Sequence, residues 1–211
     1  MSIKNTALKN LPGCSLEQIT PLGTPIICVL GCLLTDAGKV IKSEMITQLR
    51  KKYSIIAVNQ EPPGKLFEYP AISFAQMVSI TYKVPVLYIH TKGAAHAHNV
   101  YTQSACRKMW YDEFINHYDY YYDYIKQHDD HVVCPFTGGT KYTWINGFIA
   151  GTGAWSALNL RCTSDRYYYE YVFRDTNVVL HGRLMNNVTL YPSPETDAMI
   201  NYIHQVNYEV V

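Results

Sequence analysis

The segment YIHTKG, residues 88–93, carries the side chains of this sequence that are best suited to chemistry. His90 can offer a neutral imidazole to a metal ion or a hydrogen bond to a phosphate, and Lys92 adds positive charge two residues later. A histidine that merely ends a strand and a lysine that faces water would give the same pattern, so both interpretations stay open. Nearby, His96 and His98 form an H-x-H pair, which could chelate a metal if the segment were a strand.

Two common phosphate-binding signatures are missing from the sequence. Neither G-x-G-x-x-G nor G-x-x-x-x-G-K-[ST] occurs, which argues against a Rossmann dehydrogenase and against a P-loop kinase. Lys and Arg total 18 against 17 Asp and Glu, a formal net charge of +1. Because a protein that binds duplex DNA needs a concentrated positive surface, we expect no nucleic-acid partner.

The composition is that of a globular protein, with 48% hydrophobic residues among 211. No apolar run reaches the ~18 residues of a membrane-spanning helix, and the first residues lack the apolar core of a signal peptide. The six cysteines are widely spread, and several lie in apolar runs where Cys behaves as a small hydrophobe, so we expect them to be reduced. These features predict a soluble protein without a membrane span, located in the cytoplasm, or in the host cytoplasm if the sequence is viral.

An α/β framework must position the YIHTKG segment. Short apolar runs typical of strands covered on both faces alternate with helical patterns, which is the signature of parallel strands joined by right-handed crossovers. The expected strands are 26–34, 53–59 and 84–90, and the expected helices are 44–53, after an N-cap at Ser43, and 70–83. The sequence therefore predicts one α/β domain over residues 1–211, with a mostly parallel central sheet of about six strands flanked by helices.

The remainder of the chain is less regular. We expect one or two helices within 101–127, a strand at 131–136 and a glycine-rich turn, strand and second turn within 137–153. Further on, we expect a helix at 164–174, a strand at 177–180 and a terminal helix after Pro194 with Met199, Ile200 and Ile203 directed inward.

Ligands of open α/β sheets bind outside the carboxyl ends of the strands, where helix N-termini also point their free amides. The polar residues that follow each predicted strand are therefore the first candidates for a site. They are residues 31–36, Asn59, residues 90–93, and Asn146 with Gly147, although Asn and Gly are also the residues that a turn with positive φ requires.

A family resemblance rests on three pieces of residues 84–158: VLYIHTKGAAHAHNV, the MW that follows, and WINGFIAGTGAWSAL. They resemble GT-A-type glycosyltransferases with a Y-[LI]-H-T-K-G signature, which occur in capsular and rhamnose-type polysaccharide synthesis. The chain as a whole is similar to the glycosyltransferase domains of chlorella-virus proteins of capsid-glycan synthesis, which implies a fragment of a longer multidomain chain. The resemblance implies a GT-A fold, a UDP-sugar donor and a divalent cation, usually Mn²⁺.

The resemblance also implies roles for individual residues. The implied catalytic residues are Lys92 and Asn146, and the implied donor-sugar residues are Asn146 and Gly147. The implied nucleotide-binding residues are Gly31, Thr35, Asn59 and Thr91. The implied metal ligands are His90 and His181. The sequence departs from the family in having no D-x-D motif. Either His90 ligates a metal with fewer carboxylates around it, or Lys92 itself neutralises the leaving diphosphate.

The expected activity is transfer of a hexose or deoxyhexose from a UDP-sugar to a glycan or glycoprotein acceptor. The alternative is a catalytically inert module that binds a nucleotide sugar or carbohydrate, because D-x-D is missing. Candidates for a catalytic base or for groups near the site are Asp112, Glu113, Asp123, Asp129 and Asp130, and Arg107, Lys108 and Trp110 could meet the acceptor. The five tyrosines of 118–124 could stack on a sugar, although such tyrosines also line half-buried helices.

Overall fold

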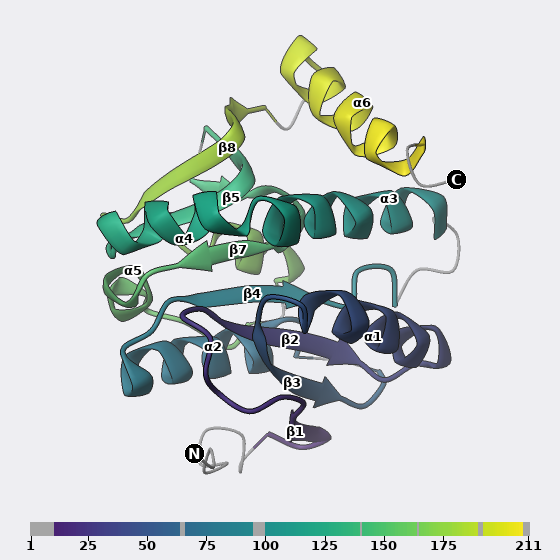
Figure 1. Cartoon of the computed structure of the whole chain (residues 1–211), viewed down its shortest axis with the longest axis vertical. Coiled ribbons are helices and arrows are strands. Elements are labelled where there is room, and N and C mark those ends of the chain that lie inside the picture. Colours follow the sequence, from purple (N-terminus) through teal and green to yellow (C-terminus); the bar gives the residue numbers. More distant parts are fainter. Residues whose placement is uncertain are drawn as a thin grey trace.

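Eight strands form one open sheet in the order β1-β3-β2-β4-β7-β5-β6, with β8 paired to β5 (Figure 1). This computed structural model describes residues 11–63, 66–94, 100–139, 141–163, 165–189 and 192–208. The strands are β1 (Cys14–Gln18), β2 (Ile27–Leu33), β3 (Ser54–Gln60), β4 (Val86–His90), β5 (His131–Gly138), β6 (Tyr142–Thr143), β7 (Phe148–Ala150) and β8 (Val179–Val188). The α-helices are α1 (Asp36–Leu49), α2 (Tyr69–Tyr82), α3 (Val100–Tyr111), α4 (Tyr118–Gln127), α5 (Thr152–Ala157) and α6 (Pro194–Tyr208), with a π-helical turn at Asp112–Asn116 and 3-10 helices at Trp144–Asn146 and Arg166–Tyr171.

The first half of the sheet has the predicted alternation of strands and helices. β2, α1, β3, α2 and β4 follow one another, and β2 pairs in parallel with both β3 and β4. The crossovers run in opposite directions along the sheet, so right-handed connections place α1 and α2 on opposite faces. Their buried side chains indeed belong to separate cores. The connection after β2 leads to β3 on one side, and the connection after β4 leads to β5 on the other side. The boundary between β2 and β4 is therefore a topological switch point.

The prediction of a mostly parallel sheet is wrong. The described strands form three parallel pairs, β2-β3, β2-β4 and β5-β8, and four antiparallel pairs, β1-β3, β4-β7, β5-β6 and β5-β7. The sheet is therefore mixed, and it has eight strands. The connections among β5, β6 and β7 are too short for the crossover of about a dozen residues that parallel pairing needs, so the chain reverses there instead.

The start of α1 also differs from the prediction. The helix begins at Asp36 because Thr35 caps it, its Oγ1 accepting a hydrogen bond from the N–H of Gly38 at 3.0 Å. Ser43, the expected N-cap, lies inside the helix. Both are good capping residues, so residue type alone could not choose between them.

The final third matches the prediction in part. The expected helix at 164–174 is a six-residue 3-10 helix, and the expected strand at 177–180 is the start of the ten-residue β8. The terminal helix exists as α6, and Met199 and Ile203 are buried on it as predicted. Ile200 is 42% exposed, so its predicted inward position is wrong.

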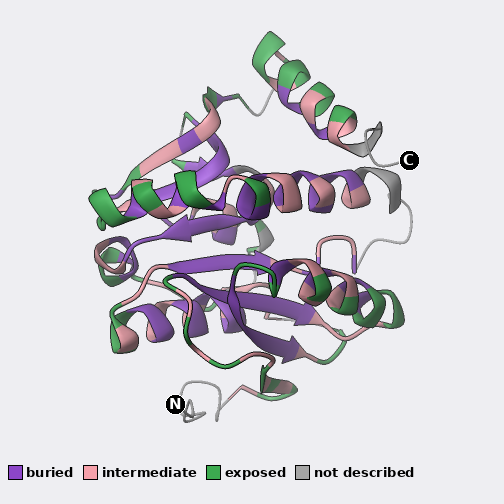
Figure 2. Ribbon diagram, in the orientation of Figure 1, coloured by how far each residue is buried: buried purple, intermediate pink, exposed green. Residues whose placement is uncertain are grey.

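The sheet separates two hydrophobic cores, and its strands are almost entirely buried at the centre (Figure 2). Along β2, Cys28 and Leu30 face the core shared with α1, α3, α4 and α6, whereas Ile27 and Val29 face the core shared with α2 and α5. This alternation follows from the period of two in a strand. All six cysteines are unpaired thiols, as predicted.

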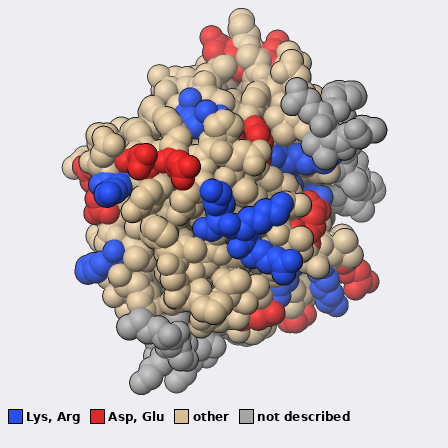
Figure 3. Space-filling model, in the orientation of Figure 1, with Lys and Arg blue, Asp and Glu red and all other residues tan. Residues whose placement is uncertain are grey.

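The surface carries charges of both signs. On the face shown in Figure 3, Lys and Arg atoms form a central group, and Asp and Glu atoms lie on several sides of it. Within the described part of the chain, no helix has the length and apolar character needed to cross a bilayer.

Candidate functional site

A cavity of about 350 Å³ lies at the carboxyl ends of β2, β3 and β4, the position where open α/β sheets bind ligands. Its floor comes from β2 and β4, with Gly31 and Tyr88 among the residues that line it. The β4–α3 connection forms one wall through His90, Thr91 and Lys92. The β3–α2 connection forms the wall on the other side of β2, with Phe67 among its residues. The structure therefore brings Gly31, His90, Thr91 and Lys92 together, as the sequence predicted.

The turn after β4 is held to β2 by hydrogen bonds. The N–H of Thr91 donates to the carbonyl of Gly31 at 2.8 Å, and Oγ1 of Thr91 accepts from the N–H of Leu33 at 3.1 Å. Gly93 then adopts a φ of +96°, and a β-carbon there would lie 2.9 Å from Cβ of Gln103. The turn thus needs a glycine for both its conformation and its contact with α3.

Arg107 supports this turn from α3. Its Nη1 donates to the carbonyl of Lys92 at 2.8 Å, and its Nη2 forms an ion pair with Oε2 of Glu44 at 3.3 Å. Oε1 of Glu44 also accepts from the hydroxyl of Tyr111 at 2.9 Å. Because Arg107 is only 7% exposed, it holds the Lys92 backbone in place, and it does not present its guanidinium at the surface for the acceptor contact considered from the sequence.

Gly31 allows close packing at the floor of the cavity. A β-carbon at Gly31 would lie 3.0 Å from Cβ of Ala71 and 3.4 Å from Cβ of His90. The imidazole of His90 stacks on Tyr88 at a centroid distance of 6.2 Å and meets the edge of Trp110 at 5.5 Å. These contacts fix His90 at the rim between the sheet and α3.

Thr35 and Asn59 lie outside the cavity lining. Thr35 caps α1 and donates to the carbonyl of Ala94 at 2.8 Å, so its hydroxyl positions the chain after the turn. The amide oxygen of Asn59 accepts from Nζ of Lys42 at 2.9 Å, and its amide nitrogen donates to Glu17 at 3.3 Å. The structure therefore does not bring the predicted Thr35 and Asn59 contacts to the cavity.

Asn146 and Gly147 do not line the cavity; Gly147 lies against the Trp110 indole, which in turn meets His90. A β-carbon on Gly147 would come within 2.5 Å of Nε1 of Trp110, so only glycine fits there. Ile145 has a φ of +57° and Asn146 a φ of +55°, conformations that are costly for a β-branched residue such as Ile145. The Asn146 side chain is 1% exposed, and neither of its polar atoms has a partner among the described residues. A strained backbone and unsatisfied polar atoms are both features of functional sites.

His181 lies far from His90. Along the sheet, His181 is level with Val133, Ile149 and Leu87, which precedes His90 by three residues. Three strand spacings separate β8 from β4, or about 14 Å. The structure therefore does not bring the two predicted metal ligands together. His96 and His98 lie outside the described residues.

His181 belongs instead to an aromatic group at the amino ends of β5 and β8. Its Nε2 pairs with the hydroxyl of Tyr120 at 2.9 Å, and its ring stacks on Tyr124 at 4.5 Å. The hydroxyl of Tyr124 pairs with Nδ1 of His131 at 2.9 Å, and the His131 ring stacks on His128 at 4.7 Å. The tyrosines of 118–124 thus line a half-buried helix.

We expect this group to make the unfolding free energy depend on pH. Burial lowers the pKa of His131 and of His181, and for His181 the neighbouring histidines add to the effect. The unfolded chain, with ordinary values near ~6.5, then takes up protons first as the pH falls. We expect the unfolding free energy to decrease as the pH drops from about 7 to about 5, and the double substitution His131→Gln/His181→Gln to make this decrease shallower. Thermal unfolding at a series of pH values measures it, and an equal slope in both proteins would contradict the assignment.

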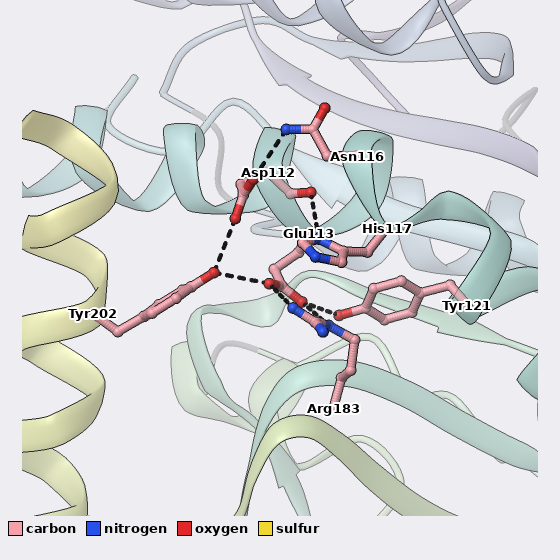
Figure 4. Close-up of polar contacts among 7 residues, drawn as sticks. All are labelled: Asp112, Glu113, Asn116, His117, Tyr121, Arg183 and Tyr202. Carbon is pink, nitrogen blue, oxygen red and sulfur yellow. Dashed lines mark hydrogen bonds and ion pairs between the residues drawn. The ribbon is translucent and has the colours of Figure 1, made fainter. Parts of the chain in front are cut away.

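A buried charge network joins the π-helical turn to β8 and α6 (Figure 4). Glu113 is 0% exposed, and Nε and Nη2 of Arg183 donate to its two carboxylate oxygens. The same oxygens accept from the hydroxyls of Tyr121 at 2.8 Å and Tyr202 at 2.9 Å. Tyr202 also donates to Asp112 at 3.0 Å. The ion pair with Glu113 raises the pKa of Arg183.

This network includes the one group of three metal-ligating side chains in the described chain, Asp112, Glu113 and His117, whose ligand atoms lie within 4.8 Å of one another. Both oxygens of Glu113 already accept two hydrogen bonds each. A metal would have to displace Arg183 and leave its charge unpaired, so we interpret the group as structural. Glu113, considered from the sequence as a catalytic base, is committed to this ion pair.

The other carboxylates considered from the sequence lie on helix surfaces or at the opposite edge of the sheet. Asp123 is exposed on α4, and Asp129 caps α5 by accepting from the N–H groups of Thr152 and Gly153, both at 2.8 Å. Asp130 lies 3.7 Å from Nε2 of His131, at the amino end of β5. The structure does not bring any of the three to the cavity lining.

The sequence reasoning missed several residues of the cavity. Phe67, Glu68, Gln103 and Glu170 all line it. Phe67 is 37% exposed and has a φ of +48°, so an aromatic ring is held at the surface by a strained backbone. The E-P-P-G breaker before α2 indicates a loop beside a strand end, and loops at that edge commonly carry binding residues.

The charged residues that line the cavity determine how it could bind a diphosphate. Lys92 supplies one positive charge, whereas Glu68 and Glu170 supply two negative charges. His90, Glu68 and Glu170 do not form a group whose ligand atoms all lie within 4.8 Å of one another. Comparisons of the chain with protein-family models, with curated proteins and with solved structures find no match.

Proposed function

We propose that the chain is a GT-A-type glycosyltransferase, which moves a hexose or deoxyhexose from a UDP-sugar to a glycan or glycoprotein acceptor, as in viral capsid-glycan or capsular polysaccharide synthesis. The observation that carries the proposal is the cavity at the β2–β4 switch point, with His90, Thr91 and Lys92 on one wall. The unpaired cysteines support the proposed cytoplasmic location.

In this proposal, Lys92 binds the diphosphate and stabilises the charge that develops on it as the sugar departs. The Lys92 ammonium forms no ion pair with a described residue. Its backbone is already fixed by Arg107 at 2.8 Å, so little reorganisation is needed on binding. The exposed ring of Phe67 offers a stacking surface for the base at the opposite wall.

Asn146 acts on the donor sugar in the same proposal. Its amide has both a donor and an acceptor without partners in the described chain, so it can bond to sugar hydroxyls once its turn opens toward the cavity. Asn146 does not line the cavity, so this role requires the turn to move. Gly147 keeps the turn against Trp110.

A divalent cation such as Mn²⁺ is part of the proposal. It would neutralise diphosphate charge that Lys92 alone leaves uncompensated. His90 is the lining residue that we assign as its ligand, and His181 is too distant to share it. We expect His90→Ala to weaken the Mn²⁺-dependent part of UDP binding, measured by titration calorimetry with and without Mn²⁺. An undiminished response to Mn²⁺ would assign the cation to other ligands.

The test of the proposed function is release of UDP from UDP-glucose and from UDP-rhamnose, with Mn²⁺, in the presence and absence of glycan acceptors. Release that depends on acceptor supports the transferase. Binding of the donors without release under any acceptor condition would instead favour the inert binding module. Failure to bind UDP or either donor would refute both.

A further inference from the structure

The hydroxyl of Tyr88 is a buried polar group for which the described part of the chain supplies no hydrogen-bond partner. Tyr88 lies on β4, is 0% exposed and lines the cavity. Its Oη has no hydrogen-bond partner among the described residues. An unsatisfied buried hydroxyl is destabilising, so its retention at a cavity floor requires an explanation.

The hydroxyl of Tyr118, which is 8% exposed, also has no partner among the described residues, whereas the four other tyrosines among the fully buried side chains each have an acceptor. They are Tyr53, which donates to the carbonyl of Phe114, Tyr121, which donates to Glu113, Tyr142, which donates to the carbonyl of Val188, and Tyr169, which donates to the carbonyl of Thr163. Each of the four hydroxyls is directed at a protein acceptor. Tyr88 differs from them in lining the cavity.

Two carboxylates accompany Tyr88 at the same cavity. Glu68 precedes α2, and Glu170 comes from the 3-10 helix Arg166–Tyr171; both line the cavity. The Glu68 charge adds to burial in raising the pKa of Tyr88, which keeps the phenol protonated and able to donate. Carboxylates accept hydrogen bonds, and a phenol both donates and accepts one. Adjacent hydroxyl groups of a sugar match this set, because each hydroxyl is also a donor and an acceptor.

We propose that Tyr88, Glu68 and Glu170 form a subsite that binds a vicinal diol, and that the Tyr88 hydroxyl is the specificity-determining group of this subsite. The proposal rests on the proposed function, because the diol would belong either to the ribose or to the transferred sugar of the donor. Lys92 and His90 lie on the β4–α3 wall, so the diphosphate and the diol have separate partners in one cavity.

The test removes the single oxygen with Tyr88→Phe and measures affinities for UDP and UDP-glucose with Mn²⁺. We expect about tenfold weaker binding of UDP-glucose, the effect of one lost hydrogen bond, and a similar loss for Glu170→Gln. If UDP weakens equally, the diol is that of the ribose; if UDP is unaffected, it is that of the hexose. Unchanged affinity for both ligands would overturn the proposal.

Stability provides a second readout. Since the Tyr88 hydroxyl has no hydrogen-bond partner within the described ranges, Tyr88→Phe should leave the melting temperature unchanged or raise it. The matched control Tyr53→Phe removes a hydroxyl that donates to Phe114 at 2.5 Å, so it should lower the melting temperature and leave ligand affinity unchanged. An equal loss of stability in Tyr88→Phe would contradict the proposal, because its hydroxyl would then be satisfied by the protein.

Failure of the proposed function is distinguishable from failure of this subsite. If the unmodified protein binds neither UDP nor UDP-glucose, the proposed function is refuted. In that case, chemical-shift titration with methyl glucoside and with uridine tests the subsite, because both carry a diol without a diphosphate. Binding that weakens in Tyr88→Phe would support the diol subsite by itself, and absence of binding would overturn it.

Discussion

Lys92→Ala is expected to lower the rate of sugar transfer by about 100- to 1000-fold, the usual effect of removing one group that stabilises developing charge. The backbone of the turn does not depend on this side chain. The N–H of Lys92 donates to the carbonyl of His90 at 2.7 Å, and its carbonyl accepts from Arg107 at 2.8 Å. We therefore expect an unchanged melting temperature, with the loss confined to steady-state kinetics and UDP affinity.

Two further variants separate charge from structure in this prediction. Lys92→Arg retains the positive charge and should recover part of the activity, although its guanidinium has a different shape. Lys108→Ala removes a lysine that lines the separate groove beside α1 and α6, and it should behave like the unmodified protein. Equal rates for Lys92→Ala and the unmodified protein would remove Lys92 from the mechanism.

Arg183→Met is expected to cost about 3–5 kcal/mol of unfolding free energy, because it leaves a buried carboxylate without its counter-charge. Glu113 is 0% exposed, and the two tyrosine hydroxyls that remain cannot neutralise it. For a chain of this length, each kcal/mol corresponds to about 2–4 °C in melting temperature. Chemical denaturation, with thermal unfolding as a check, measures the loss.

The double variant Glu113→Gln/Arg183→Met is the matched control. Gln removes the charge and keeps an amide oxygen that can accept from Tyr121 or Tyr202. We therefore expect the double variant to be more stable than Arg183→Met alone, a coupling that a double-mutant cycle isolates. If the double variant is the less stable of the two, the loss stems from packing and not from an uncompensated charge.

The first half of the fold could be predicted because its strands are uniformly apolar. The runs that became β2, β3 and β4 are buried on both faces, so they stand out from the helices between them. The second half lacks that contrast. β6 and β7 have two and three residues, and β8 mixes exposed and buried positions, so their pairing depends on partners far along the chain.

The candidate site could be predicted only where it follows a strand directly. His90, Thr91, Lys92 and Gly31 were found from their positions at strand ends, and they line one cavity. The distance between His90 and His181 depends on the order of the strands in the sheet, and this order cannot be inferred from residue spacing. Tyr88 lies inside an apolar strand, so the sequence gives no sign of a polar role. Its hydroxyl points to a site only because the structure shows no hydrogen-bond partner for it among the described residues.

We propose that a diphosphate binds at the turn after β4, and a crystal structure with UDP-glucose and Mn²⁺ tests this binding position. We expect diphosphate oxygens within hydrogen-bonding distance of Nζ of Lys92, inside the cavity that Gly31 and Tyr88 help to form. Diphosphate density in the groove lined by Glu44, Lys108 and Val206, or elsewhere away from Lys92, would contradict it.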